Sequence, residues 1–109
     1  MNIFSAFLLV TTLSSSDDDL QLGKEIYTQH CKVCHGVQGT TNPFAAQVLN
    51  PPPRNFTSQQ SKTELTEERM INSATHGRPG TAMMPWKNIL SNREIRAVIY
   101  YIRKQLMGL

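Results

Sequence analysis

Cysteine is scarce in this chain, and the patterns of sheet proteins are missing. The 109 residues include two cysteines, both within the run Cys31-Lys32-Val33-Cys34-His35, so none remains for a structural disulfide elsewhere. No strand pattern of any length is present, and no internal repeat occurs. Aliphatic residues are sparse and scattered, and a chain this short buries only a modest core. We therefore expect one small all-α domain.

Long apolar runs are also absent, apart from one near the start of the chain. Residues 3–10 are largely apolar, but they are too few for a spanning helix of about 20 residues. They fit the apolar core of a signal peptide, with small residues before a cut at Asp17. No positive charge follows Met1, so an uncleaved anchor or an atypical N-terminus stays open. We expect a signal peptide or anchor over residues 1–16 and a domain over residues 17–109.

Acidic side chains are nearly absent from the last part of the chain. Residues 69–109 carry seven basic residues and one acidic residue, a net charge of +6, whereas residues 1–68 carry four and seven, a net of −3. A basic surface can steer docking to an acidic partner, although such charges usually form a solvated face. No nucleic-acid motif accompanies the charge, so we expect no nucleic-acid partner.

The run Cys31-x-x-Cys34-His35 is the strongest chemical signal in the sequence. Two cysteines three apart, followed at once by a histidine, form the attachment pattern of a c-type haem. Each thiol can add to one vinyl group of the porphyrin, and His35 then offers its imidazole to the iron. A covalently held haem would also supply the apolar bulk that a small core lacks.

Two other roles for these cysteines have less support. A disulfide or a thioredoxin-like redox pair goes with a strand–helix unit, and no Val- or Ile-rich strand precedes Cys31. A zinc site usually needs four ligands, so it would have to recruit histidines at unhelpful spacings, namely His30, His35 or His76. We therefore expect one haem c, covalent through Cys31 and Cys34.

About four helices are expected around this motif. Acidic residues favour a helix start near Asp17, Thr66 is a candidate N-cap, and Ser91 with Glu94 forms a capping box. Gly23 is costly inside a helix, by about 1 kcal/mol relative to alanine. Close approach by another helix would explain it, and a tolerated glycine is the alternative. The expected ranges are residues 17–30, 44–49, 67–76 and 92–106.

Three residues outside the motif are further candidates for cofactor contact. The Pro43 carbonyl can accept the other ring N–H of His35, although a plain turn proline is equally consistent. Arg54 follows Pro51-Pro52-Pro53 and can pair with a haem propionate, or it can be an ordinary surface arginine. Trp86 is the third candidate for cofactor contact. The proline run fits rigid wrapping around a cofactor better than recognition by an SH3-like partner.

A loop with two adjacent methionines, Met83 and Met84, precedes the last helix. Methionine is usually core filler, but these two lie outside any helical apolar stripe. A thioether is a soft ligand that can complete an iron site opposite histidine. The chemistry of the side chain does not distinguish one methionine from the other.

Taken together, these stretches make the chain resemble a single-haem class I cytochrome c over residues 20–106. The haem motif is specific by itself, and the other stretches count as an ordered set. They are Gly23-x-x-x-Tyr27, Cys31-x-x-Cys34-His35-Gly36, Pro51-Pro52-Pro53-Arg54-Asn55-Phe56, Gly80-Thr81-Ala82-Met83, and the tail with Leu90-Ser91, Glu94-Ile95, Val98 and Tyr101-Ile102.

The resemblance implies a small all-α cytochrome c fold with histidine and methionine ligands. Its first and last helices cross, so Gly23 and Tyr27 would meet Val98 and Tyr101. Relatives commonly have Met-Pro-Pro-Trp or Met-Pro-Ser-Trp in the loop, which places Met83 at the ligand position. Met84 is the alternative, because ligand methionines in the family often precede proline, as Met84 precedes Pro85.

The resemblance also implies the role of a one-electron carrier in a respiratory or periplasmic chain, not an enzyme. Partners would be redox proteins that dock transiently, in the periplasm or on the outer face of the cytoplasmic membrane. Membrane association is expected only through the N-terminal segment. The alternatives are a haem c subunit of a larger oxidoreductase complex and a haem enzyme or gas sensor with a labile sixth ligand.

Overall fold

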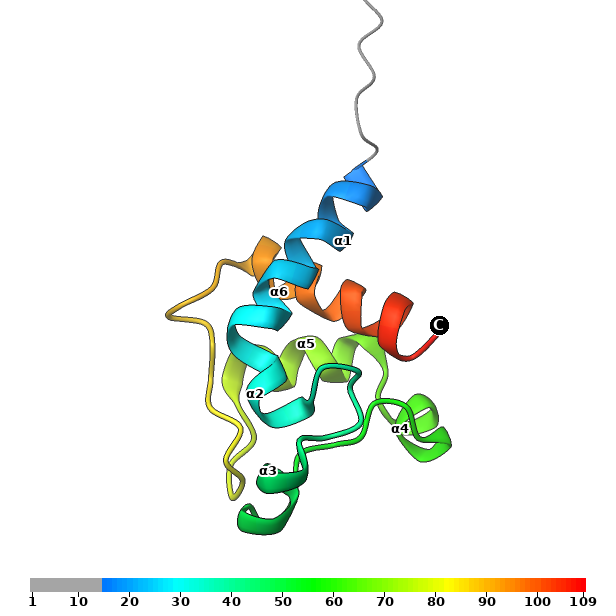
Figure 1. Ribbon diagram of the computed structural model, residues 1–109. Helices are drawn as coiled ribbons and strands as arrows, with labels where there is room; N and C mark the ends of the chain where they lie inside the picture. The colour runs from blue at the N-terminus through cyan, green and yellow to red at the C-terminus, as the bar shows by residue number, and fades with distance from the viewer. Residues whose placement is uncertain (1–14) are drawn as a thin grey trace, which may run out of the picture.

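The computed structural model describes residues 15–109, and this part is helical without any strand (Figure 1). The expected targeting segment therefore lies outside the described residues, except for its last two positions. In chain order the elements are α1 (Ser15–Ile26), the π-helical turn η1 (Tyr27–Cys31), α2 (Lys32–His35), α3 (Pro43–Val48), α4 (Gln59–Glu64), α5 (Glu67–His76), α6 (Asn92–Tyr101) and the π-helical turn η2 (Ile102–Leu106). The all-α prediction is confirmed.

Helices α1 and α6 pack closely against each other, and Figure 1 shows them crossing. A Cβ atom added to Gly23 would lie 2.7 Å from Cβ of Tyr101 and closer still to the carbonyl oxygen of Ala97. The rings of Tyr27 and Tyr101 meet nearby, with centroids 5.6 Å apart. Close helix approach thus explains the glycine, because any side chain at position 23 would separate the two helices.

One apolar cluster joins the helices. Its centre is the apolar stripe of α6, which has the 3.6-residue period of a helix with one buried face. The loops contribute Phe56 and Leu90, and the C-terminal Met107 is 1% exposed. The buried members are Ile26, Tyr27, Phe56, Leu65, Met70, Ala74, Leu90, Ile95, Val98, Ile99, Ile102 and Met107.

Local capping signals fix the starts of α5 and α6. The hydroxyl of Thr66 accepts from the backbone N–H of Arg69 at 3.2 Å. The backbone N–H of Glu94 donates to the hydroxyl of Ser91 at 3.1 Å, and the Glu94 carboxylate accepts from the Ser91 N–H at 2.8 Å. Both caps satisfy N–H groups that lack a helical partner, and both predictions are confirmed.

Two elements differ from the sequence prediction. The first helix was expected to end at His30, but the chain stays helical through η1 and α2 as far as His35. Helix α4 was not expected, because residues 59–64 have no apolar period; it is capped instead by the hydroxyl of Ser58, which accepts from the Ser61 N–H at 3.1 Å.

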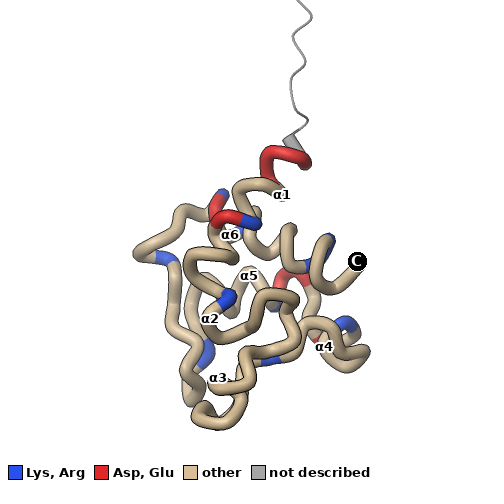
Figure 2. The backbone as a smooth tube through the Cα atoms, viewed as in Figure 1, with Lys and Arg blue, Asp and Glu red and all other residues tan. Residues whose placement is uncertain are grey.

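The charged side chains are spread over several elements. Figure 2 shows an acidic run at the start of α1, whereas lysine and arginine occur at separate places along the tube. Some basic residues have partners within the chain: Arg93 lies 3.4 Å from Asp19, and Arg103 donates to the Leu65 carbonyl at 2.7 Å. No helix within residues 15–109 has both the length and the apolar character to cross a membrane.

Candidate functional site

The two cysteines and His35 come from one helical stretch. Cys31 ends η1, and Cys34 and His35 belong to α2. Positions i, i+3 and i+4 of a helix share one face, so this stretch brings the three side chains together. Neither cysteine takes part in a disulfide, and both are partly buried.

Burial disfavours a charged thiolate at the first cysteine. Desolvation, with a smaller contribution from neighbouring Cys34, raises the pKa of Cys31 to about 12. At neutral pH this group is a thiol, whereas the thiolate is the form that attacks disulfides and binds metals. The described residues also contain no cluster of three His, Cys, Asp or Glu side chains fit for a metal ion. The burial of Cys31 thus gives no support to a redox dithiol.

The imidazole of His35 is held by a main-chain carbonyl. Its Nδ1–H donates to the carbonyl oxygen of Arg54 at 3.1 Å. Burial lowers the pKa of His35, and the hydrogen bond to Arg54 opposes this in part. The bond fixes the ring tautomer and leaves Nε2 as the nitrogen that can bind a metal.

The acceptor of this hydrogen bond is the carbonyl of Arg54. The sequence left two roles open for Pro43, this acceptor or a plain turn proline, and the structure gives the acceptor role to Arg54. Pro43 instead opens α3 behind the N-cap Asn42, whose side chain accepts from the N–H groups of Phe44 and Ala45. A proline is favoured at the first helical position, because its missing N–H would have no partner there.

The ring of Phe56 stacks on the ring of His35. Their centroids are 4.4 Å apart and their planes differ by 16°. Phe56 was quoted in the sequence only as part of a family-like stretch, and no pattern in the chain pointed to this contact. A buried aromatic two residues beyond the hydrogen-bonding carbonyl therefore belongs to the surroundings of His35.

The side chain of Arg54 has a partner within the protein. Its guanidinium lies 2.7 Å from the Glu64 carboxylate, and both groups are partly exposed. This hydrogen bond is the main reason why the pKa of Glu64 is lowered, and a second bond from Gln60 adds to the effect. Contact between the Arg54 guanidinium and a haem propionate stays a prediction.

The loop with the two methionines is held through the backbone of Met83. Its carbonyl oxygen accepts from the Arg78 N–H at 3.0 Å, and its N–H donates to the Thr81 hydroxyl at 3.1 Å. The Met83 side chain packs against the apolar cluster, whereas Met84 is 44% exposed. The structure thus directs Met83 toward the apolar cluster and leaves Met84 more exposed.

Trp86 closes this loop against α5. Its backbone N–H donates to the Ala74 carbonyl at 2.9 Å, and its side chain packs against the apolar cluster. Its ring faces that of His30, with centroids 4.9 Å apart. Trp86 thereby connects the end of the methionine loop to the helical stretch that carries the cysteines.

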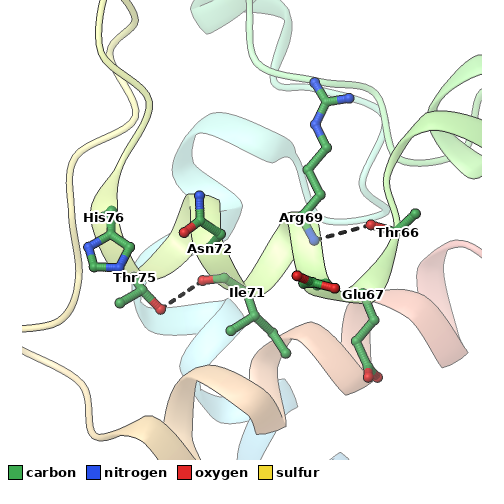
Figure 3. Close-up of a pocket in the computed structure, with 8 residues that line it drawn as sticks. Thr66, Glu67, Arg69, Ile71, Asn72, Thr75 and His76 are labelled. Atoms are coloured by element: carbon green, nitrogen blue, oxygen red, sulfur yellow. Dashed lines mark hydrogen bonds between the residues drawn. The ribbon is translucent and has the colours of Figure 1, made fainter.

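A separate groove follows the outer side of α5 (Figure 3). Its volume is about 640 Å³, and every lining residue belongs to α5 or is its cap. Figure 3 shows polar side chains along it, including Asn72 and Thr75, with His76 at one end. None of the candidate site residues lines it.

The sequence of this chain also matches a known protein family. Residues 20–105 match the family described as Cytochrome c. The chain belongs to the cytochrome c family. A search of curated proteins finds no match.

Solved structures agree with the family assignment. The KustC0563 c-type cytochrome is 32% identical, with a TM-score of 0.65, covering 75% of this chain and 94% of that one. A chain of the Kuenenia stuttgartiensis reducing HAO-like protein complex is 25% identical with a TM-score of 0.62, covering 81% of this chain but 42% of that one. Cytochrome cL from Methylophaga aminisulfidivorans shares the fold at 14% identity, with a TM-score of 0.63.

The residues of this chain fit a covalent haem c. Two thiols and a histidine share one helical stretch, and Nδ1 of the histidine is already occupied by the Arg54 carbonyl. Cys31, Met83 and Trp86 all pack against the same apolar cluster, so the candidate attachment and ligand residues border a common core. The donor set, two thiols with one imidazole and one thioether, is the set that haem c uses.

Proposed function

We propose that this cytochrome c is a one-electron carrier and not an enzyme. The observation that supports this most is that both candidate axial ligands are held by backbone hydrogen bonds, His35 through Arg54 and Met83 through Arg78 and Thr81. Bound haem c supplies an iron that changes between the ferrous and ferric states. A protein that fills both axial positions leaves no open position for a substrate.

Each residue then has a defined part in this role. Cys31 and Cys34 would attach the porphyrin through thioethers, and His35 would offer Nε2 to the iron. Met83 would offer its thioether, a ligand that raises the reduction potential. Trp86 keeps the methionine loop against α5.

Met83 is the better candidate for the sixth ligand than Met84. Its backbone is held at both the N–H and the carbonyl, and its side chain faces the apolar cluster. Met84 is 44% exposed and directly precedes Pro85, which restricts its backbone to extended conformations. A ligand whose backbone is already fixed loses less conformational freedom when it binds the iron, which favours Met83.

The partners and location follow from the same role. A carrier must dissociate after each transfer, so we propose weak, transient docking with redox proteins. We place the protein in the periplasm or on the outer face of the cytoplasmic membrane, with any membrane attachment through the N-terminal segment.

A second candidate is a haem c subunit in a larger oxidoreductase. One structural relative belongs to a protein complex, and this chain spans less than half the length of that relative. Size-exclusion chromatography of the protein purified from its source would separate the two. A carrier should elute as a small protein, and a subunit should co-elute with its partners.

Optical spectra of the purified protein, oxidised and reduced, test the proposal directly. We expect the spectrum of low-spin haem c and no rapid change when carbon monoxide is added to the ferrous form. Rapid carbon monoxide binding would favour a haem enzyme or gas sensor. Extraction with acid acetone should leave the haem on the polypeptide, and release of the haem would contradict covalent attachment.

A further inference from the structure

The segment of residues 53–56 is pinned at both ends to the loop that follows the haem motif. The Thr41 hydroxyl donates to the Pro53 carbonyl at 3.0 Å. The Phe56 N–H donates to the Gly39 carbonyl at 2.7 Å. A Cβ atom at Gly39 would lie 3.4 Å from Cβ of Phe56, which is an ordinary van der Waals contact, so the two segments lie side by side.

Between these two fixed points the segment contacts the His35 imidazole twice. The Arg54 carbonyl accepts from Nδ1, and the Phe56 ring lies nearly parallel to the imidazole at 4.4 Å. Phe56 is 6% exposed and belongs to the apolar cluster, so its ring has little room to turn away.

The two contacts restrict different motions of the imidazole. A single hydrogen bond fixes the direction of Nδ1 but still allows the ring to turn about the line from Nδ1 to the carbonyl oxygen. A flat face stacked at 4.4 Å opposes that turn, because the imidazole edge would collide with the phenyl ring. Together the carbonyl and the phenyl face determine both the direction and the plane of the ring.

We propose that Phe56 is a positioning residue that sets the plane of the His35 imidazole and thereby tunes the haem iron. The proposal rests on the proposed ligation of iron by His35. The plane of an axial imidazole determines how its π orbitals overlap with the iron d orbitals. Groups that orient a ligand therefore alter the properties of the metal without touching it.

Four substitutions separate positioning from ordinary packing. Phe56→Leu keeps apolar volume but removes the flat aromatic face, whereas Phe56→Tyr keeps that face. Phe44→Leu makes the same chemical change at a phenylalanine that is 71% exposed. Ile99→Val, in the buried stripe of α6, lowers stability without contact with His35.

The readouts are the haem-methyl proton shifts of the ferric holoprotein and the reduction potential. We expect Phe56→Leu to change the pattern of methyl shifts and to alter the reduction equilibrium constant at least threefold, which is about 28 mV for one electron. Phe56→Tyr, Phe44→Leu and Ile99→Val should keep the pattern of the unmodified protein. If Phe56→Leu loses stability but keeps the unmodified shifts and potential, Phe56 only fills space and the proposal is wrong.

The unmodified protein provides a test that does not depend on the folding of a variant. In the diamagnetic ferrous form, nuclear Overhauser contacts should join the ring protons of Phe56 and His35. Their absence would overturn the proposal even if Phe56→Leu yields no holoprotein. Failure of the proposed function is distinct, because unmodified protein would then lack covalent haem or a low-spin spectrum.

Discussion

A Cβ atom at Gly77 would lie 2.8 Å from the carbonyl oxygen of Met83. That oxygen also accepts from the Arg78 N–H, so the missing side chain at position 77 permits the hydrogen bond that holds Met83. The end of α5 and the position of the candidate ligand therefore depend on one glycine. Gly77 has φ of +72° and is the C-cap of α5. It also lies directly against the backbone of the methionine loop.

Gly77→Ala should weaken methionine ligation. A side chain there has to displace the Met83 carbonyl, and it also has to adopt φ 72° and ψ −177°, a region essentially restricted to glycine that costs about 1–3 kcal/mol. We expect loss of the weak red-edge band of methionine-ligated ferric haem and a lower reduction potential. Gly80→Ala is the matched control, because Gly80 has φ of +82° but nothing within 4 Å of an added Cβ. If both variants lose the band equally, backbone strain and not contact with Met83 is responsible.

Met83→Ala and Met84→Ala should differ in the same measurements. We expect Met83→Ala alone to lose the red-edge band, to lower the reduction potential, and to open the ferrous iron to carbon monoxide. Met84 is 44% exposed and is not among the side chains packed against the apolar cluster, so its truncation should leave all three unchanged. The reverse result would assign Met84, and a band missing from the unmodified protein would exclude methionine ligation.

The helices and the haem motif could be predicted because their signals are local. The caps of α5 and α6 lie within three residues of the groups they bind, and the apolar stripe of α6 repeats along one element. The Cys31–His35 run carries its chemistry in five consecutive residues.

The surroundings of His35 could not be predicted in the same way. The hydrogen bond from His35 spans nineteen residues and ends on a main-chain oxygen, which every residue possesses, so the identity of Arg54 gave no clue. Phe56 reaches His35 through a segment without helix or strand, where no periodicity indicates which way a side chain points. Helix α4 was missed for the related reason that it starts at a serine cap and buries little apolar surface.

Ionised Glu64 should stabilise the folded protein, and this stabilisation should be lost at acid pH. Its pKa is lowered in the folded state, chiefly by the hydrogen bond from Arg54. The ionised Glu64 carboxylate therefore stabilises the folded protein at pH values above its unfolded pKa of 4.5. This stabilisation is lost as the pH falls through the lower pKa of the folded state. Thermal midpoints measured between about pH 3 and pH 7 should fall more on the acid side for the unmodified holoprotein than for Glu64→Gln.

The effect of Glu64 should be small, because the pair lies at the surface and surface ion pairs are weak. Glu68→Gln is the control, since it removes one carboxylate that has no hydrogen bond to Arg54. An identical pH dependence in Glu64→Gln and the unmodified protein would mean that the Arg54–Glu64 contact contributes nothing to stability in solution.

Gly23→Ala should destabilise the crossing of α1 and α6. The added methyl group overlaps both the Ala97 carbonyl and Cβ of Tyr101, and overpacking of this kind costs about 1–3 kcal/mol. Denaturant unfolding of the holoprotein measures this loss. Tyr101→Ala in the same protein should not restore stability, because alanine keeps the Cβ atom at position 101 and the Ala97 carbonyl belongs to the backbone of α6. Full recovery in the double variant would show that the tyrosine ring, and neither of these two atoms, determines the helix separation.

The two cysteines should each retain haem in the absence of the other. Cys31→Ala and Cys34→Ala each leave one thiol on the same helical stretch as His35, so one thioether can still form. We expect haem to remain on the polypeptide after acid acetone in both single variants, with the alkaline pyridine spectrum shifted to the red because one vinyl group stays unsaturated. The double variant should release its haem completely. Haem that resists extraction from the double variant would mean attachment elsewhere, and haem lost from either single variant would mean that one thioether is not enough to hold it in this fold.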